Sequence, residues 1–158
     1  MKAYDYLKQL EIWDTIIQNK IVELEQWRLI ALGITSRLDG ERVQSSGSQQ
    51  KMADAVNRYI DIGREADEYI DKLTDKKQEA IHLLDQLAFK NYTHYDILHK
   101  MYIGKAVTQP DGTIVTIRMD FTEIAELYGK SYSWATTVHG RALQNFQQIL
   151  DANKPLRA

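Results

Sequence analysis

Six polar side chains with the chemistry to contact nucleic acid gather in a short segment near the C-terminus: Lys130, Tyr132, Ser133, Thr136, Thr137 and Arg141. Lysine and arginine bind phosphates, whereas hydroxyl groups contact phosphates or the edges of bases. No aspartate or glutamate occurs from Ser131 to Leu150, so no carboxylate in that stretch would repel phosphates. The segment therefore predicts a DNA-binding helix, with Lys130 and Arg141 toward phosphates and the other four side chains toward bases.

Other chemistries lack the residues that they need. The chain has no cysteine, which excludes disulfides, thiolate metal sites and a cysteine nucleophile. The acidic residues between Glu65 and Asp75 fall mainly off the apolar face of their predicted helix, as on a solvated surface. The four histidines show no metal-ligand spacing: His82, His94, His99 and His139. We predict a protein that is not an enzyme and that uses neither a metal nor a cofactor.

Composition narrows the class of protein further. The chain has 158 residues and a net charge of -2. It therefore lacks the large positive net charge of proteins that coat nucleic acid without regard to sequence. Contact with DNA must therefore be local. No apolar run approaches the roughly 20 residues that span a bilayer, and the N-terminal segment carries charges every few residues. We expect a cytoplasmic protein with no membrane partner.

Two long amphipathic segments must position this helix. Apolar residues recur at alternating steps of three and four, first at Ala3, Tyr6, Leu10, Trp13, Ile17, Leu24, Trp27 and Ala31. A second such seam runs through Met52, Val56, Tyr59, Gly63, Ala66, Ile70, Leu73, Ala80, Leu84 and Leu87. Both seams are too long for a small globule, so we predict an antiparallel, coiled-coil-like helical hairpin over residues 1–90. Glycines and serines predict a polar loop over residues 33–50, with the first helix ending between Ala31 and Gly33.

Shorter elements follow in a second predicted domain, residues 91–158. Thr93 and Asp96 have the spacing of a helix-starting capping box, and Gly104 would end that helix. A Pro-Asp-Gly turn between two β-branched runs predicts an inserted β-hairpin over residues 105–119. The fold class is thus all-α, with this insertion as its one β element.

The last two predicted helices have defined ends. Asp120 and Glu123 form a second capping-box pattern, Gly129 would stop that helix, and Ser131 would cap a final helix reaching about Ala152. Two helices joined by a short glycine-containing turn form the helix-turn-helix arrangement. Two packed helices with no role in DNA binding would show the same local pattern.

The string EIAELYGKSYSWATTVHGRALQNFQQIL resembles the terminal helix-turn-helix of bacterial sigma factor region four. It is more similar still to the sigma-like late-gene regulators of Gram-positive phages, the ArpU-like and RinA-like proteins. The loop string ITSRLDGERVQSSGS resembles a loop of an uncharacterised phage protein family with the same architecture. The resemblance implies a phage or prophage regulator that binds promoter DNA in the host bacterial cytoplasm, with host RNA polymerase as a further partner.

Two departures distinguish this chain from those families. The segment after Gly104 carries the insertion through Met119, where the relatives have only a short turn. The final helix offers one arginine and one histidine, where sigma-like helices often carry several basic residues. Three classes of protein remain open: a sigma-like transcription regulator, a small terminase subunit for DNA packaging, and an interaction module that binds protein instead of DNA. The oligomeric state stays open at this point, with a homodimer through the helical hairpin as one candidate assembly.

Overall fold

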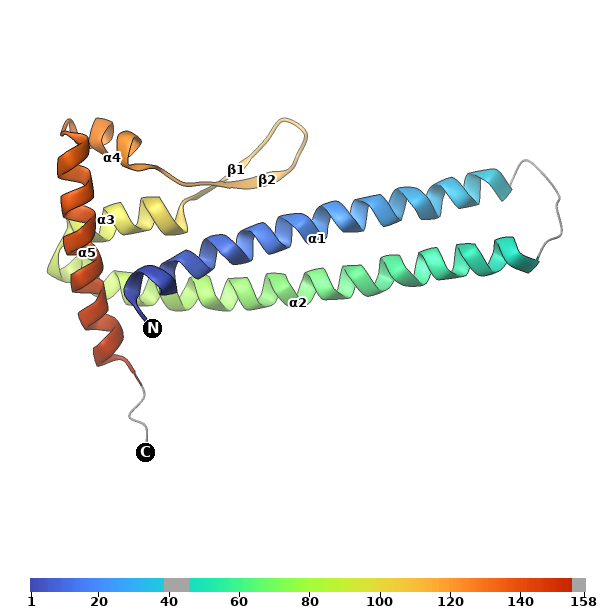
Figure 1. The fold of residues 1–158 in the computed structure, drawn as a ribbon, viewed down its shortest axis with the longest axis horizontal. Helices are drawn as coiled ribbons and strands as arrows, with labels where there is room; N and C mark the ends of the chain where they lie inside the picture. The colour runs from blue at the N-terminus through green and yellow to red at the C-terminus, as the bar shows by residue number, and fades with distance from the viewer. Residues whose placement is uncertain (39–45, 155–158) are drawn as a thin grey trace. The chain divides into compact units, whose positions relative to one another are not determined.

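The computed structural model describes residues 1–38 and 46–154 (Figure 1). The described chain is mostly helical and contains one small antiparallel sheet. In chain order the elements are α1 (Ala3–Leu38), α2 (Ser46–Lys90), α3 (Tyr92–Leu98), the π-helical turn η1 (His99–Ile103), β1 (Lys105–Thr108), β2 (Ile114–Ile117), α4 (Phe121–Tyr128) and α5 (Tyr132–Ala152). The predicted helical class is confirmed at this level.

The chain packs as two units, and α1 and α2 contribute to both. We call Trp13–Leu73 the hairpin unit and Met1–Ile12 with Thr74–Ala158 the terminal unit. The first turns of α1 thus belong with the C-terminal elements and not with the rest of their own helix. The sequence places a domain boundary between residues 90 and 91, whereas the terminal unit contains residues on both sides of it.

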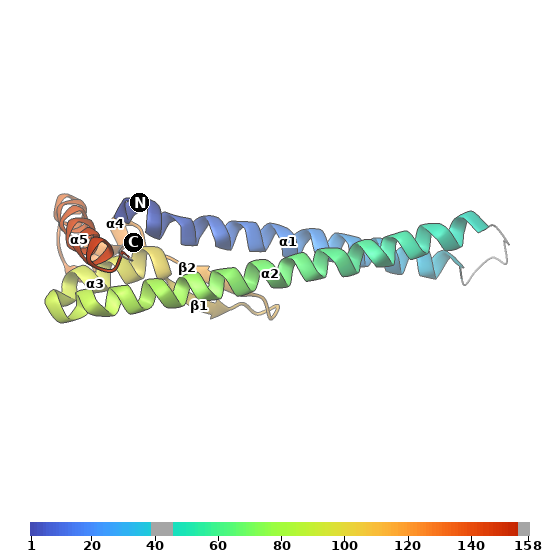
Figure 2. The ribbon, with the colours of Figure 1, turned by 90° about the horizontal axis from the view of Figure 1, so that it is seen from below.

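Within the hairpin unit α1 and α2 run antiparallel, side by side in both views (Figures 1 and 2). The antiparallel direction follows from three contacts, because residues later in α1 contact residues earlier in α2. Trp13 lies on Tyr69 with 5.5 Å between ring centroids. Further along α1, Lys20 Nζ lies 2.8 Å from Glu65 Oε2, and Glu23 meets Arg58, which lies still earlier in α2.

The α1 seam is close to the predicted one, whereas the α2 seam is displaced. Ile17 is buried as expected, but Val56 and Ile70 are 40% and 41% exposed. The buried α2 positions in the hairpin unit are Ala55, Ile62, Ala66 and Leu73. The predicted seam was wrong at Val56 and Ile70 because two apolar stripes run along α2. Periodicity alone does not say which stripe meets α1.

The predicted polar loop over residues 33–50 is shorter than expected. α1 continues through Gly33 to Leu38, and α2 already begins at Ser46. A single glycine costs a helix about 1 kcal/mol, which the long helix on its N-terminal side absorbs. Gln49, Gln50 and Lys51 are all good helix formers, so the early start of α2 follows from propensity. Residues 39–45, the remainder of that predicted loop, lie outside the described residues.

The terminal unit is built around α5. A core cluster joins α3, α4 and α5 through Ile97, Ile124, Ala125 and Ala135. Phe146, further along α5, is fully buried, with the Tyr6 ring 6.0 Å away. The small side chains of Ala125 and Ala135 let α4 and α5 approach closely where they cross.

Most of the helix ends in the terminal unit match the predictions. Asp120 and Glu123 form a complete capping box at the start of α4. The first helix after α2 is the exception, because its N-cap is Asn91 and not Thr93. Asn91 Oδ1 accepts a hydrogen bond from the backbone N–H of His94 at 3.1 Å. Asn91 is also a strong capping residue, and it stands directly after the last residue of α2.

The predicted β-hairpin is confirmed, with Ala106 opposite Thr116 and Val107 opposite Val115. Gly104 ends the preceding η1 turn with φ of 73°. A Cβ at Gly104 would lie 2.5 Å from Ile117 O, so the position requires glycine both for its φ and for the close approach of β2. In the described part of the chain, no helix is both long and apolar enough to cross a membrane.

Candidate nucleic-acid interface

A tight turn of three residues connects α4 to α5. Gly129 adopts a left-handed conformation, with φ of 60° and ψ of 38°, and its N–H bonds to the end of α4. Lys130 N–H donates to Ala125 O at 2.9 Å. Ser131 then caps α5, because its hydroxyl oxygen accepts from the Trp134 backbone N–H at 3.1 Å. The turn is therefore held by hydrogen bonds at both of its ends, which fixes where α5 begins.

The buried side of α5 determines which residues it presents outward. Its buried positions are Ala135, His139, Ala142, Phe146 and Ile149. At 3.6 residues per turn the opposite side carries Ser133, Thr137, Gly140, Arg141 and Gln144, all of them exposed. We call these five residues the outer face of α5. This face contains hydroxyls, an amide and a guanidinium but no carboxylate.

The structure brings together three of the six predicted site residues on this outer face: Ser133, Thr137 and Arg141. Lys130 lies exposed in the turn just before the helix. Thr136 lies about a quarter turn round the helix from the centre of the outer face, and Tyr132 lies about a third of a turn from it. Tyr132 is 58% exposed, and its ring packs edge-on against Phe121 with 5.8 Å between centroids. Thr136 is half-buried.

The threonine hydroxyls have partners inside the helix. Thr137 Oγ1 donates to the backbone oxygen of Ser133 at 2.8 Å, and Thr136 Oγ1 donates to the same oxygen at 3.0 Å. Each hydroxyl proton is therefore in use, and what Thr137 offers outward is an acceptor oxygen and a methyl group. In a DNA major groove those groups match the amino group of adenine or cytosine and the methyl group of thymine.

Sequence reasoning missed Gly140 and Gln144 as members of the outer face. The signal was present, because Gln144 follows Thr137 by seven residues, which is two helical turns. Gly140 was overlooked because a glycine has no side chain to contribute. At this position a Cβ would meet no atom within 4 Å, so packing within the chain does not require the glycine.

His139 is a buried residue of the inner side of α5. Its Nε2 lies 2.8 Å from the Tyr102 hydroxyl, a hydrogen bond that ties α5 to the η1 turn. The Phe121 ring packs against the imidazole at 5.0 Å in a T-shaped arrangement. Burial lowers the pKa of His139 and raises the pKa of Tyr102, so both groups stay neutral near pH 7. His139 therefore anchors the buried side of α5, opposite the outer face.

His94 supports the next turns of α5 in the same way. Its Nδ1 lies 2.8 Å from Asn145 Nδ2, so the imidazole accepts a hydrogen bond there and carries its proton on Nε2. Burial lowers the pKa of His94, and the positive charge of Arg141 lowers it further. The guanidinium that would meet a phosphate is thus close enough to this histidine for the two charges to interact.

Trp134 belongs to the core and not to the exposed surface. Its ring packs on Tyr128 with 5.3 Å between centroids and joins the cluster around Ile97 and Ile124. Tyr128 in turn donates its hydroxyl proton to Asp96, a carboxylate that is also paired with Lys100. This chain of contacts fixes the angle between α3, α4 and α5.

Among the described residues, no three histidine or acidic side chains gather in a group that could hold a metal ion. Comparisons of the chain with models of known protein families, with curated proteins and with solved structures gave no match. The site consists of two capped helices, a tight turn, and an outer face that is polar and free of carboxylates.

Proposed function

We propose that this protein is a sigma-like DNA-binding transcription regulator of a phage or prophage, acting in the cytoplasm of the host bacterium. In this proposal α4 and α5 form a helix-turn-helix, and α5 enters the major groove. The observation that carries it is the outer face of α5, which lies opposite the buried side and presents Ser133, Thr137 and Arg141 without an acidic residue.

The expected contacts divide into two classes. Lys130 and Arg141 neutralise phosphates, and these contacts supply affinity that does not depend on base sequence. Ser133 and Thr137 meet base edges, where an acceptor oxygen and a methyl group discriminate between base pairs. Tyr132 and Thr136 lie beside this face and extend the contact toward the flanking sugar-phosphate backbone. Two cations give modest affinity, so host RNA polymerase or a second DNA-binding chain would strengthen promoter binding.

The β-hairpin is a second candidate element for contact with DNA. Its turn is held by the Thr113 hydroxyl, which donates to Asp111 Oδ1 at 2.6 Å, and by the Gln109 backbone N–H, which donates to Thr113 O at 2.7 Å. Lys105 and Thr108 on β1 are exposed. Lys105 is the basic residue of β1 that would meet a phosphate.

The salt dependence of DNA binding tests the proposal. Fluorescence anisotropy with promoter DNA of a candidate phage would be measured across a salt series, with and without host RNA polymerase. We expect salt-sensitive binding, and Arg141→Ala should reduce the salt slope by about one phosphate contact. Thr137→Ala should change base preference at a cost of about 1–3 kcal/mol at the preferred site.

A matched control lies in the hairpin unit. Arg64 is exposed, as Arg141 is, and pairs with Asp61 on its own helix, so Arg64→Ala should leave DNA binding unchanged. If the wild-type chain shows no salt-sensitive binding in either condition, or if Arg141→Ala behaves like Arg64→Ala, α5 is not a DNA reader. The chain would then be an interaction module that binds protein.

The small terminase subunit is the second candidate, because such proteins also join a DNA-binding helix pair to long helices. It shares the expected DNA contact but differs in assembly, since packaging uses a ring of many subunits. The mass of the particle in solution separates the two functions.

A further inference from the structure

A cavity of about 380 Å³ lies in the terminal unit between the β-hairpin and η1. Sites for small molecules are concave and mostly apolar, with volumes of about 300–1,000 Å³. The cavity is lined by His99 and Lys100 of η1, by Lys105, Val107 and Ile117 of the strands, and by the nearby Gly104 and Met119. We call it the β-hairpin pocket. Its size is that of a site for a small organic molecule.

One wall of the β-hairpin pocket is a face of the two-stranded sheet. Lys105 lies opposite Ile117, and Val107 follows Lys105 by two residues on β1. Paired residues, and residues two apart along a strand, lie on the same face of a sheet. Val107 is half-buried and Ile117 is 53% exposed. This wall is therefore apolar apart from Lys105, and the chain's own side chains do not close it off from solvent.

The η1 turn supplies the other wall. Turns of the π-helical type are rare and are frequent at functional sites. The Gly104 backbone N–H donates to His99 O at 2.8 Å, which closes the turn. The Met119 backbone N–H donates to Lys100 O at 3.0 Å, which joins the segment after β2 to the same turn. Backbone hydrogen bonds thus hold both walls in place, as in the largely pre-formed sites that bind small molecules.

The lining residues carry positive charge and no carboxylate. Lys100 is paired with Asp96, which also accepts a hydrogen bond from the Tyr128 hydroxyl, so the charge of Lys100 is already matched. Lys105 is exposed and supplies the charge that a ligand would meet. Burial lowers the pKa of His99, and the charge of Lys100 lowers it further, so the imidazole is neutral near pH 7. The pocket therefore combines an apolar wall with one cation.

We propose that the β-hairpin pocket binds a small organic acid, with its carboxylate at Lys105 and its hydrocarbon body against Val107, Ile117 and Met119. Burial of the body against these side chains supplies most of the affinity. The cation at the mouth selects an anion over a neutral molecule of the same shape. A ligand with several charges, such as a nucleotide, fits less well, because it would place further charges on an apolar wall.

The proposal does not rest on DNA binding, because no residue of α4 or α5 lines the β-hairpin pocket. Lys105 is also the β1 residue that would meet a DNA phosphate, so ligand binding is measured on protein without DNA. A chain that binds an organic acid but no DNA would support this proposal while it refutes the DNA-binding function.

Titration of the full-length, isotope-labelled chain with octanoate, followed by nuclear magnetic resonance, tests the proposal. We expect saturable shifts of the backbone amide signals of His99, Val107 and Ile117. Octanamide has a similar body without the charge and should bind about 2–5-fold more weakly, as expected for the loss of one exposed ion pair. Acetate has the charge without the body and should cause no saturable shift over the same concentration range.

Two variants assign the contacts. Lys105→Ala should reduce the affinity for octanoate to that for octanamide, whereas Lys90→Ala should leave both unchanged, because Lys90 is an exposed lysine of the same unit outside the pocket. Val107→Trp should fill the cavity and abolish the binding of both compounds. The circular dichroism spectrum should stay helical in all three variants, since Lys105, Lys90 and Val107 are not buried.

Four results would each overturn the proposal. They are the absence of saturable shifts with octanoate, shifts that map outside the β-hairpin pocket, equal affinities for octanoate and octanamide, and a Lys105→Ala variant that behaves like Lys90→Ala.

Discussion

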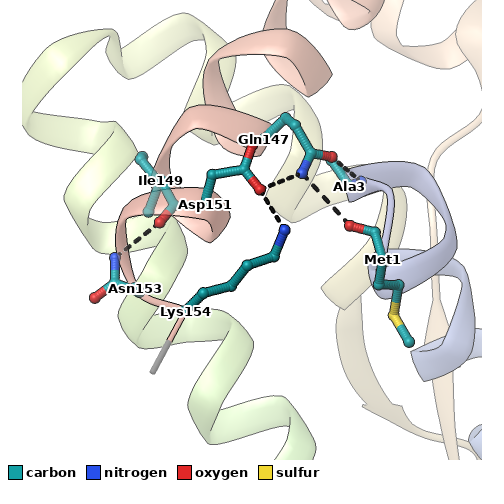
Figure 3. A network of polar contacts seen from close by, with 7 residues as sticks. All are labelled: Met1, Ala3, Gln147, Ile149, Asp151, Asn153 and Lys154. Carbon is teal, nitrogen blue, oxygen red and sulfur yellow. Dashed lines mark hydrogen bonds and ion pairs between the residues drawn. The ribbon is translucent and has the colours of Figure 1, made fainter. Parts of the chain in front are cut away.

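The side-chain oxygen Oε1 of Gln147 accepts a hydrogen bond from the backbone N–H of Ala3 at 2.6 Å (Figure 3). Ala3 is the first residue of α1, and the N–H groups of a first helical turn have no partner within their own helix. Residues 144 positions apart thus provide a helix cap across the terminal unit. The same carboxamide donates to Asp151 Oδ1 at 3.1 Å, and Lys154 also binds that oxygen.

Gln147→Ala should lower the free energy of unfolding of the terminal unit by about 1 kcal/mol, the usual cost of losing a helix cap. Chemical denaturation followed by circular dichroism would measure the change. Gln148→Ala is the matched control, because Gln148 is exposed on the same helix, and it should be close to neutral. Hydrogen exchange at Ala3 should accelerate in Gln147→Ala alone. Equal exchange in both variants would contradict the capping role.

Acidification below about pH 6.5 should destabilise the terminal unit through three of its histidines. Burial lowers the pKa values of His139, His94 and His99 in the folded chain. A histidine in the unfolded chain titrates near pH 6.5, so the unfolded state takes up more protons below that pH. The stability contribution is thus complete above about pH 6.5 and is lost as the pH falls toward the lower folded values.

Melting temperatures at pH 7.5 and 5.5 would measure this effect. The difference should shrink in His139→Gln, which removes one of the three groups, and should persist in the matched variant His82→Gln, because His82 is exposed. An identical pH dependence in wild type and His139→Gln would show that His139 contributes nothing to the linkage.

Substitutions in the hairpin unit should differ in their cost to the free energy of unfolding according to whether the residue lies in the buried seam. Ile62 is fully buried, so Ile62→Ala should cost about 2–4 kcal/mol through lost transfer energy and a cavity. Ile30→Ala, at a position that is 46% exposed in the same unit, should cost about 0.5 kcal/mol or less. Urea denaturation at one fixed protein concentration would compare them. Equal costs would refute the assignment of Ile62 to the seam.

Two glycines should respond in opposite ways to alanine. Gly104→Ala places a Cβ 2.5 Å from Ile117 O at a φ of 73°, so it should destabilise the terminal unit by about 2 kcal/mol or more. Thermal denaturation would measure the loss. A neutral Gly104→Ala would mean that β2 does not approach this glycine closely in solution.

Gly140→Ala should instead raise stability by about 0.5–1 kcal/mol, because the position is helical and a Cβ there meets no atom within 4 Å. The same substitution should weaken DNA binding, since Gly140 lies on the outer face of α5, where the groove would approach the backbone. Melting and anisotropy measured on one preparation give both readouts. Unchanged DNA affinity would place the groove contact away from Gly140.

The sequence alone determined those features that depend on neighbours along the chain. The capping box at Asp120, the stop at Gly129, the cap at Ser131 and the β-hairpin all follow from local hydrogen bonds and backbone preferences, and the structure has each of them. The outward positions of Ser133, Thr137 and Arg141 followed in the same way, because the apolar residues of α5 leave only one side for the core.

Tertiary structure decided what periodicity leaves open. α2 has two apolar stripes, and only packing against α1 selects Ala55 and Ile62 over Val56 and Ile70. The burial of His94 and His139, and the cap that Gln147 gives to Ala3, depend on residues that are far apart in the chain. A helical pattern repeats every 3.6 residues whichever partner the helix finds, so it predicts which residues share a face but not what that face meets.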